Sequence, residues 1–412
     1  MGNMIASGVF LLPTSLAPYG WNAIFGWAAT IIGVMILAYV LAQLTRRLPD
    51  SSGPIDMVRI AFGPTAAFTI GWSYWVSVWT SNVTIAIGAA SYLSLFIRPI
   101  RETPGMGAVT AFILIWLLTF LNLRGAGTVG RFQMVTLILK LIPLLIVAAL
   151  ISLILARSGT SSLLPYHGKD ISLSGITATA ALTLWALCGF EVASAAADKV
   201  HDPARTIVRA TLIGTFATGL IYFFVCSGIA LMLPPDVAQH SDAPFADFVM
   251  LNWSSGPANF VGLFAAISAI GALNGWILIQ GEVPLAMART GQLPGWFAKT
   301  DARGTPARAL ILSSALASIL LLANSLRAMA DIFTFMALLA TAASLWLYLA
   351  CAAAALRLKI AMPAALVGLL YAMWTLWGAG GTASGLSVLL MLSGLPLYWW
   401  TKRKQKIERP AA

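Results

Sequence analysis

The chain alternates between long apolar runs and short polar breaks, a pattern typical of helices that cross a membrane. One crossing of a bilayer core about 30 Å thick needs about 20 apolar residues. The runs and their Gly-, Pro- and Asp-rich breaks predict about twelve spans, with Ile55 to Phe62 as a short amphipathic helix before the third. The predicted spans are roughly 1–18, 22–44, 64–97, 107–123, 131–156, 173–197, 207–233, 256–287, 307–328, 330–356, 361–378 and 381–400.

The first predicted span differs from the others because its polar interruption, Ala6-Ser7-Gly8, comes only a few residues after Met1. A complete crossing would need about a dozen more apolar residues ahead of that point. We therefore expect that the first helix is truncated and that the natural N-terminus lies upstream.

The composition agrees with a membrane protein: 59% of residues are hydrophobic and 9% are charged, against about 25% charged in soluble proteins. The mean hydropathy of +0.86 excludes a soluble enzyme, a secreted disulfide scaffold and a disordered chain. Cys188, Cys226 and Cys351 lie in apolar runs and are interpreted as small core residues. The three histidines lie far apart in loops, so we expect no metal site and no cofactor.

The net charge of +11 is interpreted as a topology signal rather than as a nucleic-acid-binding surface. Nineteen of the 25 Lys and Arg residues lie in one set of alternate loops and in the basic tail 401–412, and five lie in the opposite loops. Basic residues accumulate on the cytoplasmic side of membrane proteins. The split therefore predicts that both termini are cytoplasmic.

Two ionisable residues fall well inside predicted spans, Glu191 in the sixth and Lys140 in the fifth. Charged groups at membrane depth are costly and are frequently functional. Either one could act on substrate or protons, or could pair with a neighbouring helix as a packing contact. We favour the functional reading for Glu191 and leave both readings open for Lys140.

Spans one and six are weak helix formers at corresponding positions, Gly2 to Gly8 in one and Cys188-Gly189 in the other. Paired interruptions of this kind indicate an inverted-repeat transporter with a substrate site at the membrane midplane. An unwound segment there frees backbone N–H and C=O groups for a carboxylate and an ammonium. The predicted organisation is a first repeat over 1–156, a second over 173–356, two further spans in 361–400 and the tail 401–412.

Trp79, Trp185 and Trp276 lie in the middle of predicted spans. Central indoles are either packing residues or, beside a carboxylate, parts of an aromatic box for an organic cation. Trp185 and Glu191 are six residues apart, so a continuous helix would hold them about 120° apart. An unwound Cys188-Gly189 break is expected to bring both side chains to one cavity.

Several motifs recur together along the chain. They are Gly2-Asn3, Ser7-Gly8-Val9-Phe10-Leu11-Leu12-Pro13, Tyr74-Trp75 with Trp79 and Asn82, Leu184-Trp185 with Gly189 and Glu191, Pro203 with Arg205, Gly275-Trp276, and Gly304-Thr305-Pro306. As a set they resemble the basic amino acid/polyamine antiporters of the amino acid–polyamine–organocation (APC) superfamily, above all its arginine/agmatine exchangers. The resemblance implies an all-α integral membrane fold of about twelve helices, a LeuT-type 5+5 inverted repeat plus two extra helices, in the bacterial inner membrane and often as a homodimer.

Carried over residue by residue, the resemblance implies which backbone groups hold the substrate's amino acid end. Ser7 and Gly8 would offer backbone N–H groups to its carboxylate. Met4, Trp185 and Cys188 would offer carbonyls to its α-ammonium.

The same resemblance implies side-chain contacts to the rest of the substrate. The indole of Trp185 would stack on the charged head, and Asn82 and Ser77 would form hydrogen bonds to it. Trp276 would cover the aliphatic stem.

Gating and pH sensing would fall to Tyr74 and Glu191 on the same resemblance, which also has three departures. Ala6 stands where the family has a glycine. Trp346 is expected at the span-ten position whose tyrosine meets the gating glutamate in the family. Lys140 resembles the span-five lysine of proton-dependent and heteromeric amino acid transporters of the same superfamily.

Two transport functions therefore remain open. The first is an antiporter that exchanges a cationic amino acid for its decarboxylated amine by alternating access, in the manner of arginine and agmatine. The second is a proton-coupled or facilitative transporter of neutral amino acids. An intramembrane enzyme is excluded because the spans have no cluster of His, Asp and Glu and no nucleophile–base pair, and a receptor would need a sizeable extramembrane domain. The cationic substrate is favoured by Trp185, Asn82, Glu191 and Trp276.

Overall fold

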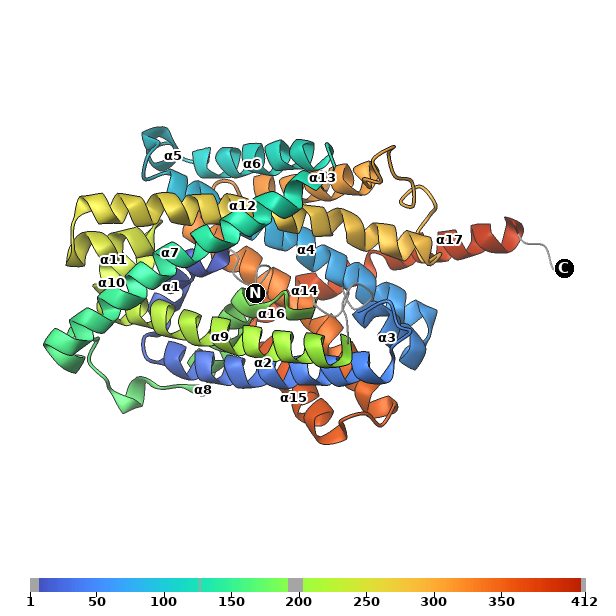
Figure 1. Cartoon of the computed structure of the whole chain (residues 1–412), viewed down its shortest axis with the longest axis horizontal. Coiled ribbons are helices and arrows are strands. Elements are labelled where there is room, and N and C mark those ends of the chain that lie inside the picture. Colours follow the sequence, from blue (N-terminus) through green and yellow to red (C-terminus); the bar gives the residue numbers. More distant parts are fainter. Residues whose placement is uncertain (1–6, 126, 192–202, 409–412) are drawn as a thin grey trace.

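The computed structural model describes residues 7–125, 127–191 and 203–408, with side chains for 9–125, 139–191 and 209–404. Every regular element within these ranges is helical, and the long helices lie side by side in a bundle (Figure 1). A helix satisfies its own backbone hydrogen bonds, which is what a segment surrounded by lipid requires. The expectation of an all-helical protein is confirmed for the described residues.

Predicted spans two to eleven each have a helix in place. These helices are α2 (Asn22–Arg47), α4 (Pro64–Leu93), α6 (Met106–Asn122), α7 (Gly127–Ser158), α8 (Leu173–Leu187), α9 (Pro203–Met232), α12 (Ser255–Arg289), α13 (Ala307–Ala323), α14 (Met329–Arg357) and α15 (Met362–Gly378). Among the described residues, six helices are long and apolar enough to cross a membrane, and four more are apolar but shorter. The total of twelve crossings and the 5+5 repeat stay predictions.

The remaining elements are short. Residues 7–19 form a 3₁₀ turn (Ser7–Phe10), α1 (Leu12–Leu16) and a second 3₁₀ turn (Ala17–Tyr19), in line with the helix-weak first span. The amphipathic stretch before span three is α3 (Pro54–Phe62), as expected. The hydropathy pattern missed α5 (Arg98–Glu102), α10 (Pro235–His240), α11 (Pro244–Asn252) and two 3₁₀ turns (Gly159–Ser162, Gly168–Asp170).

The predicted span over 381–400 lies within the stretch Gly381–Lys404, which is long and apolar enough to cross a membrane. A two-residue turn at 393–394 divides this stretch into α16 (Gly381–Leu392) and α17 (Leu395–Glu408). Trp72 of α4 meets the chain at this point, and its indole N–H donates to the carbonyl of Leu390 (3.0 Å). A Cβ atom on Gly394 would lie 2.5 Å from the Trp72 ring. The interruption therefore lets the tryptophan approach the backbone closely. Helix α17 projects beyond the rest of the bundle (Figure 1).

Helix α14 lies in the core of the bundle, where it packs along α4, while another side of α4 packs against α12. Of the apolar stretch in α14, 72% is buried, against 22% in the stretch that covers α16 and part of α17. Because α4 contacts both α12 and α14 along much of its length, polar residues of these three central helices meet one another inside the protein.

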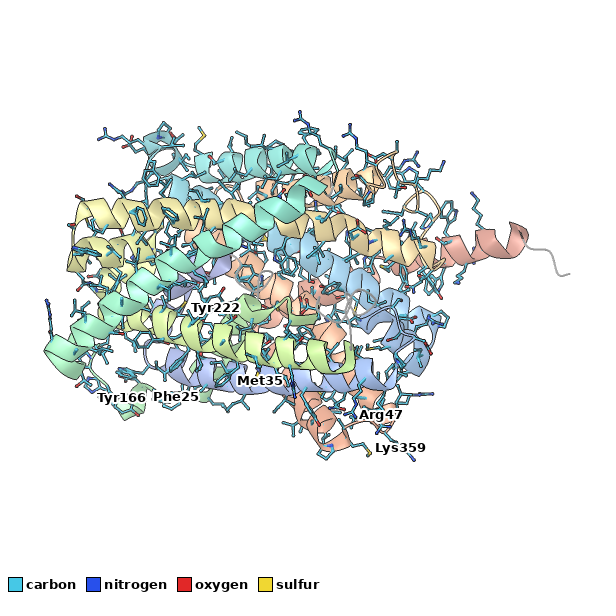
Figure 2. The ribbon with its side chains drawn as sticks, viewed as in Figure 1. Phe25, Met35, Arg47, Tyr166, Tyr222 and Lys359 are labelled. Carbon is cyan, nitrogen blue, oxygen red and sulfur yellow. The ribbon has the colours of Figure 1, made fainter. Side chains whose placement is uncertain are left out.

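The two sets of loops lie at opposite ends of the bundle. Arg47 at the end of α2 and Lys359 after α14 lie at one end, and Phe25 and Tyr166 lie toward the other (Figure 2). The end that carries Arg47 and Lys359 is called the basic end below.

Candidate functional site

Helix α8 ends at Leu187, inside the bundle and at the predicted break. Cys188 has a non-helical backbone (φ −59°, ψ 150°), and Gly189 has a φ of +106°. A φ in this region favours glycine because glycine has no Cβ atom to clash. The interruption predicted from Cys188-Gly189 is therefore confirmed.

The carboxylate of Glu191 follows this break and accepts three hydrogen bonds. Its Oε1 accepts from the phenol of Tyr74 (3.0 Å), and its Oε2 accepts from the phenol of Tyr348 (2.8 Å) and the backbone N–H of Gly189 (2.9 Å). Phe190 stacks on the Tyr348 ring with 5.0 Å between ring centroids. One buried carboxylate thus joins α4, α14 and the end of α8.

Trp346 is not the span-ten residue that meets Glu191, so this prediction is wrong. Its indole N–H donates to Ser387 Oγ of α16 (3.1 Å), while Tyr348 meets the carboxylate. Two residues two positions apart in a helix point about 200° apart, so they contact different neighbours. A usable signal was present, because Tyr348 is the only tyrosine in α14.

A small central cavity lies beside the break. It is lined by Val9, Ser81, Ile85, Trp185, Ala186, Cys188 and Trp276. Its volume of about 10 Å³ has room for about one water molecule. The indole N–H of Trp185 donates to Ser81 Oγ (3.3 Å), and the ring meets Phe333 edge to face at 5.4 Å. The structure therefore brings Trp185, Cys188 and Trp276 together, as predicted, around a small space.

Ser77 and Asn82 were also expected at this site, but neither lines the cavity. The Ser77 hydroxyl donates to the carbonyl of Tyr74 (2.7 Å). The Asn82 amide donates to Gln280 Oε1 of α12 (2.7 Å). Ser81, one turn beyond Ser77 on α4, is the serine that contacts Trp185, and sequence reasoning missed it.

Only some of the site residues predicted in the first span lie among the described residues. Met4 lies outside the described residues, and Ser7 and Gly8 are described by their backbone alone. Lys140 lies buried on α7, with 1% of its surface exposed. Its expected closeness to the interruption in span one involves residues 1–6, which are not among those described, and stays a prediction.

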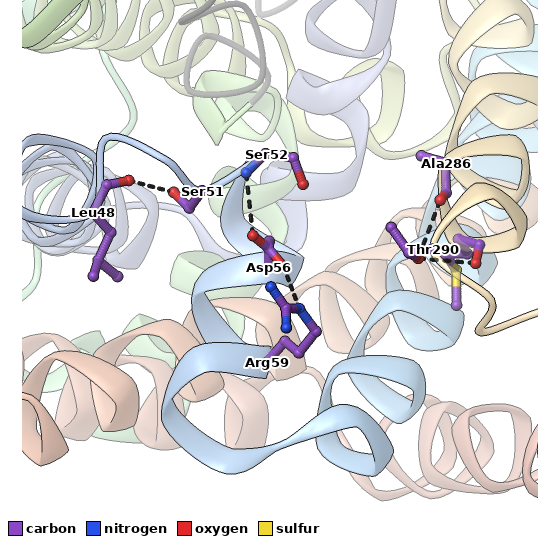
Figure 3. A network of polar contacts seen from close by, with 8 residues as sticks. Leu48, Ser51, Ser52, Asp56, Arg59, Ala286 and Thr290 are labelled. Atoms are coloured by element: carbon purple, nitrogen blue, oxygen red, sulfur yellow. Dashed lines mark hydrogen bonds and ion pairs between the residues drawn. The ribbon is translucent and has the colours of Figure 1, made fainter. Parts of the chain in front are cut away.

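A larger cavity of about 380 Å³ opens at the basic end and reaches Tyr74 and Glu191. Its lining contains three carboxylates, Asp56, Glu191 and Glu282, and no Lys or Arg among the described lining residues. We call this cavity the acidic vestibule. Figure 3 shows part of its wall, where Asp56 accepts from the Ser52 N–H (3.3 Å) and from Arg59 (2.5 Å).

The expectation that Trp185 and Glu191 share a cavity is wrong for this conformation. Trp185 lines the central cavity, and Glu191 lines the acidic vestibule. The segment from Cys188 to Glu191 lies between the two spaces because Cys188 lines one and Glu191 the other. The break separates the two cavities here instead of joining them.

A helical bundle with an interrupted helix, a small cavity lined by indoles and a wider vestibule that ends at a buried carboxylate has the architecture of a membrane transporter. The amino acid permease family matches residues 1–409, and the chain belongs to this family. It is a multi-pass membrane transporter and not an enzyme.

Curated relatives identify the branch of the family. The cadaverine/lysine antiporter of Escherichia coli (strain K12) is 32% identical over 316 residues, which cover 76% of this chain and 70% of the relative. The arginine/ornithine antiporter of Pseudomonas aeruginosa is 27% identical over 441 aligned positions, covering 100% and 90%. The putrescine transporter of Haemophilus influenzae is 27% identical over 421, covering 99% and 96%. The family predicted from the motifs, the basic amino acid/polyamine antiporters, is confirmed.

Proposed function

We propose that the protein exchanges a cationic amino acid for its decarboxylated amine by alternating access, as a secondary active antiporter. The acidic vestibule carries this proposal. The lining contains three carboxylates, of which Asp56 is paired with Arg59, and a concave surface rich in carboxylates attracts cations and disfavours anions. The names of the relatives agree with this class of substrate, since cadaverine is the amine that lysine yields on decarboxylation. Lysine/cadaverine and arginine/agmatine are the first pairs to test.

The central cavity would hold the substrate once it has widened. Trp185 would stack on the cationic head, with a gain of roughly 2 kcal/mol for a desolvated indole. Trp276 would cover the stem, and the carbonyl of Cys188 would accept from the α-ammonium. Met4, Ser7 and Gly8 would supply the backbone groups of span one.

Tyr74, Glu191 and Tyr348 would form the gate between the acidic vestibule and the central cavity. The two phenols donate to the carboxylate from α4 and α14, so a movement that parts these helices must break at least one of the bonds. Protonation of Glu191 would weaken its attraction for the donors, which gives the gate a response to pH. Asn82 would present an acceptor to the cationic head.

The basic end would face the cytoplasm of a bacterial cell, with both termini on that side of the inner membrane, because basic loops accumulate there. The acidic vestibule would then be the cytoplasmic opening. The homodimer implied by the family resemblance belongs to the same proposal.

A proton-coupled transporter of neutral amino acids is the second candidate, and the buried Lys140 favours it. An ammonium with 1% of its surface exposed inside a membrane span is costly to keep charged. Loss and gain of a proton there could drive a transport cycle. Trp346 lies against α16 and has no part in either proposal.

Counterflow in proteoliposomes tests the proposal. Vesicles are loaded with unlabelled lysine, cadaverine, arginine, agmatine, ornithine or leucine, and each labelled compound is then added outside. We expect uptake of a cationic amino acid only when a cationic partner is inside, with no need for a proton gradient. Leucine uptake that needs a proton gradient and no internal substrate would replace antiport by the second candidate.

A further inference from the structure

We propose that Gln280 is a positioning residue that makes Asn82 present its oxygen, and not its nitrogen, to the cationic head of the substrate. The inference rests on the proposed function and deepens it. It concerns how the site favours a substrate whose cationic head donates hydrogen bonds over a substrate with a hydrocarbon side chain. Both amides are fully buried, between α4 and α12.

The two amides lie one helical turn from the central cavity. Asn82 precedes the lining residue Ile85 by three positions on α4, and Gln280 follows the lining residue Trp276 by four positions on α12. Residues at these spacings share one face of a helix. Asn82 also follows the lining residue Ser81 directly, so its bond to Gln280 lies beside residues that line the cavity.

A chain of four hydrogen bonds fixes the direction of donation. Thr119 donates to the carbonyl of Ile115 (2.7 Å), so its oxygen accepts the proton of Ser314 (2.7 Å). Ser314 then has only an oxygen lone pair to offer, which accepts from the Gln280 nitrogen (2.7 Å). The Gln280 oxygen is left to accept from the Asn82 nitrogen (2.7 Å). A backbone carbonyl can only accept, so the order cannot reverse while the chain is intact.

Two further contacts hold Gln280 in this orientation. Its nitrogen also faces the carbonyl of Leu310 (3.5 Å), a second group that can only accept. The indole N–H of Trp75 donates to the Gln280 carbonyl (3.1 Å) and to Ser313 Oγ (2.9 Å), which fixes the backbone of α12 at this point.

The consequence falls on Asn82. Its nitrogen is used by Gln280, and its Oδ1 is buried without a hydrogen-bond partner in the structure. A buried acceptor without a donor is unfavourable. An ammonium or guanidinium offers only donors, so a cationic head satisfies this oxygen and a hydrocarbon side chain does not. A reversed amide would present N–H groups and repel the same cation.

The test is a double-mutant cycle on the purified protein, with binding of lysine or arginine (whichever counterflow selects) measured by calorimetry. Gln280→Met keeps the side-chain volume and removes both hydrogen bonds, so the Asn82 amide can turn over. We expect cation affinity to fall about ten-fold, as for loss of a hydrogen bond to a charged group. Asn82→Asp replaces the amide by a carboxylate, whose two oxygens both accept hydrogen bonds, so the orientation of this side chain no longer matters. In the Asn82→Asp background, Gln280→Met should therefore change the affinity by less than about two-fold.

Three controls separate positioning from general damage. Gln280→Glu, protonated in this buried position, still accepts from Asn82 and donates to Ser314, so it should retain cation affinity, and it replaces Gln280→Met if that variant does not fold. Ser318→Ala removes an equivalent buried hydroxyl one turn along α13, where it accepts from the Trp116 indole (3.0 Å), and should leave binding unchanged. Norleucine, which has the stem of lysine without its ε-ammonium, should not respond to Gln280→Met.

Additive losses in the cycle, or equal losses for lysine and norleucine, would mean that Gln280 only supports the fold and would overturn the inference. The same holds if Gln280→Met and Gln280→Glu both bind the cation as the wild type does. Failure of the proposed function is recognised separately, since a wild-type protein that exchanges no cationic substrate is found before any variant is made, and it overturns both.

Discussion

The phenol of Tyr348 donates a 2.8 Å hydrogen bond to the carboxylate of Glu191, a residue 157 positions earlier in the chain. The bond joins the core helix α14 to the point where α8 is interrupted. Tyr74 donates to the other oxygen of the same carboxylate from α4. The helices α4 and α14 and the end of α8 are thus connected through one side chain.

Tyr348→Phe should loosen this connection. The ring can keep its stack on Phe190, but the donor to Glu191 is lost, which should lower stability by about 1–3 kcal/mol. We expect a lower melting temperature in detergent and an altered exchange rate and pH profile in counterflow. The matched control is Tyr398→Phe, because Tyr398 is also buried, stacks on Phe68 and bonds through its hydroxyl to Thr65 (3.3 Å). Identical exchange behaviour of the two variants would argue against a gate at Tyr348.

Gly189→Ala should disturb the interruption of α8. The φ of +106° at this position costs a residue with a Cβ atom about 1–3 kcal/mol. The substitution should also strain the hydrogen bond from this N–H to Glu191. We expect reduced stability together with reduced exchange. Gly385→Ala is the control, because Gly385 lies in α16 with open space at its Cβ position, and alanine there should be neutral or stabilising. Equal stability of both variants would show that the backbone at Gly189 adapts without strain.

Asp242, in the loop between α10 and α11, should make stability depend on pH. Burial raises the pKa of its carboxyl above the ordinary 3.8, Arg101 opposes this, and Asp247 adds to it. The folded protein therefore holds this proton more tightly than the unfolded chain, so stability falls as pH rises between the two pKa values and the loss persists above them. Asp242→Asn should raise the melting temperature at pH 7 and have little effect below about pH 4.

The control for this variant is Asp236→Asn, because Asp236 is an exposed carboxylate of α10 in the same region. Melting temperatures of both variants and of the wild type are measured in detergent between about pH 4 and pH 8. A gain in Asp242→Asn that does not change with pH would mean that the asparagine forms a new contact.

Hydropathy was sufficient to predict where the long helices lie, because a crossing of fixed thickness requires apolar runs of a set length, but it missed the short helices α5, α10 and α11. Cys188-Gly189 also predicted the end of α8, since glycine is the residue that adopts the positive φ found there. The interruption between α16 and α17 has a local signal that hydropathy alone does not register, Gly394 followed by Pro396. The contact of the Trp72 indole with this turn spans more than 300 positions in the sequence, and no local pattern predicts it.

The rotation of the central helices was the other feature that hydropathy did not determine. Helix α14 is apolar on every side, so hydropathy does not tell whether Trp346 or Tyr348 faces Glu191, and the prediction chose the wrong one. The pairing of Asn82 with Gln280 spans 198 positions between two buried helices. Contacts of this kind depend on how helices are turned and shifted against each other, which only the three-dimensional packing determines.

Trp185→Leu tests whether the central indole recognises charge or only fills space. In the small central cavity the indole donates to Ser81 and packs edge-on against Phe333, contacts that any packing residue could make. A cation stacked on a desolvated indole gains roughly 2 kcal/mol, so its loss should weaken binding of lysine or arginine roughly 30-fold, at a factor of ten for each 1.4 kcal/mol. Leucine, if it binds, should lose much less because it has no charge to stack. Trp346→Leu is the control, since that indole contacts Ser387 away from both cavities. Calorimetric titration of the purified variants with arginine, agmatine and leucine makes the comparison. An equal loss for all three ligands would identify Trp185 as a packing residue, and the cationic substrate would then rest on the acidic vestibule alone.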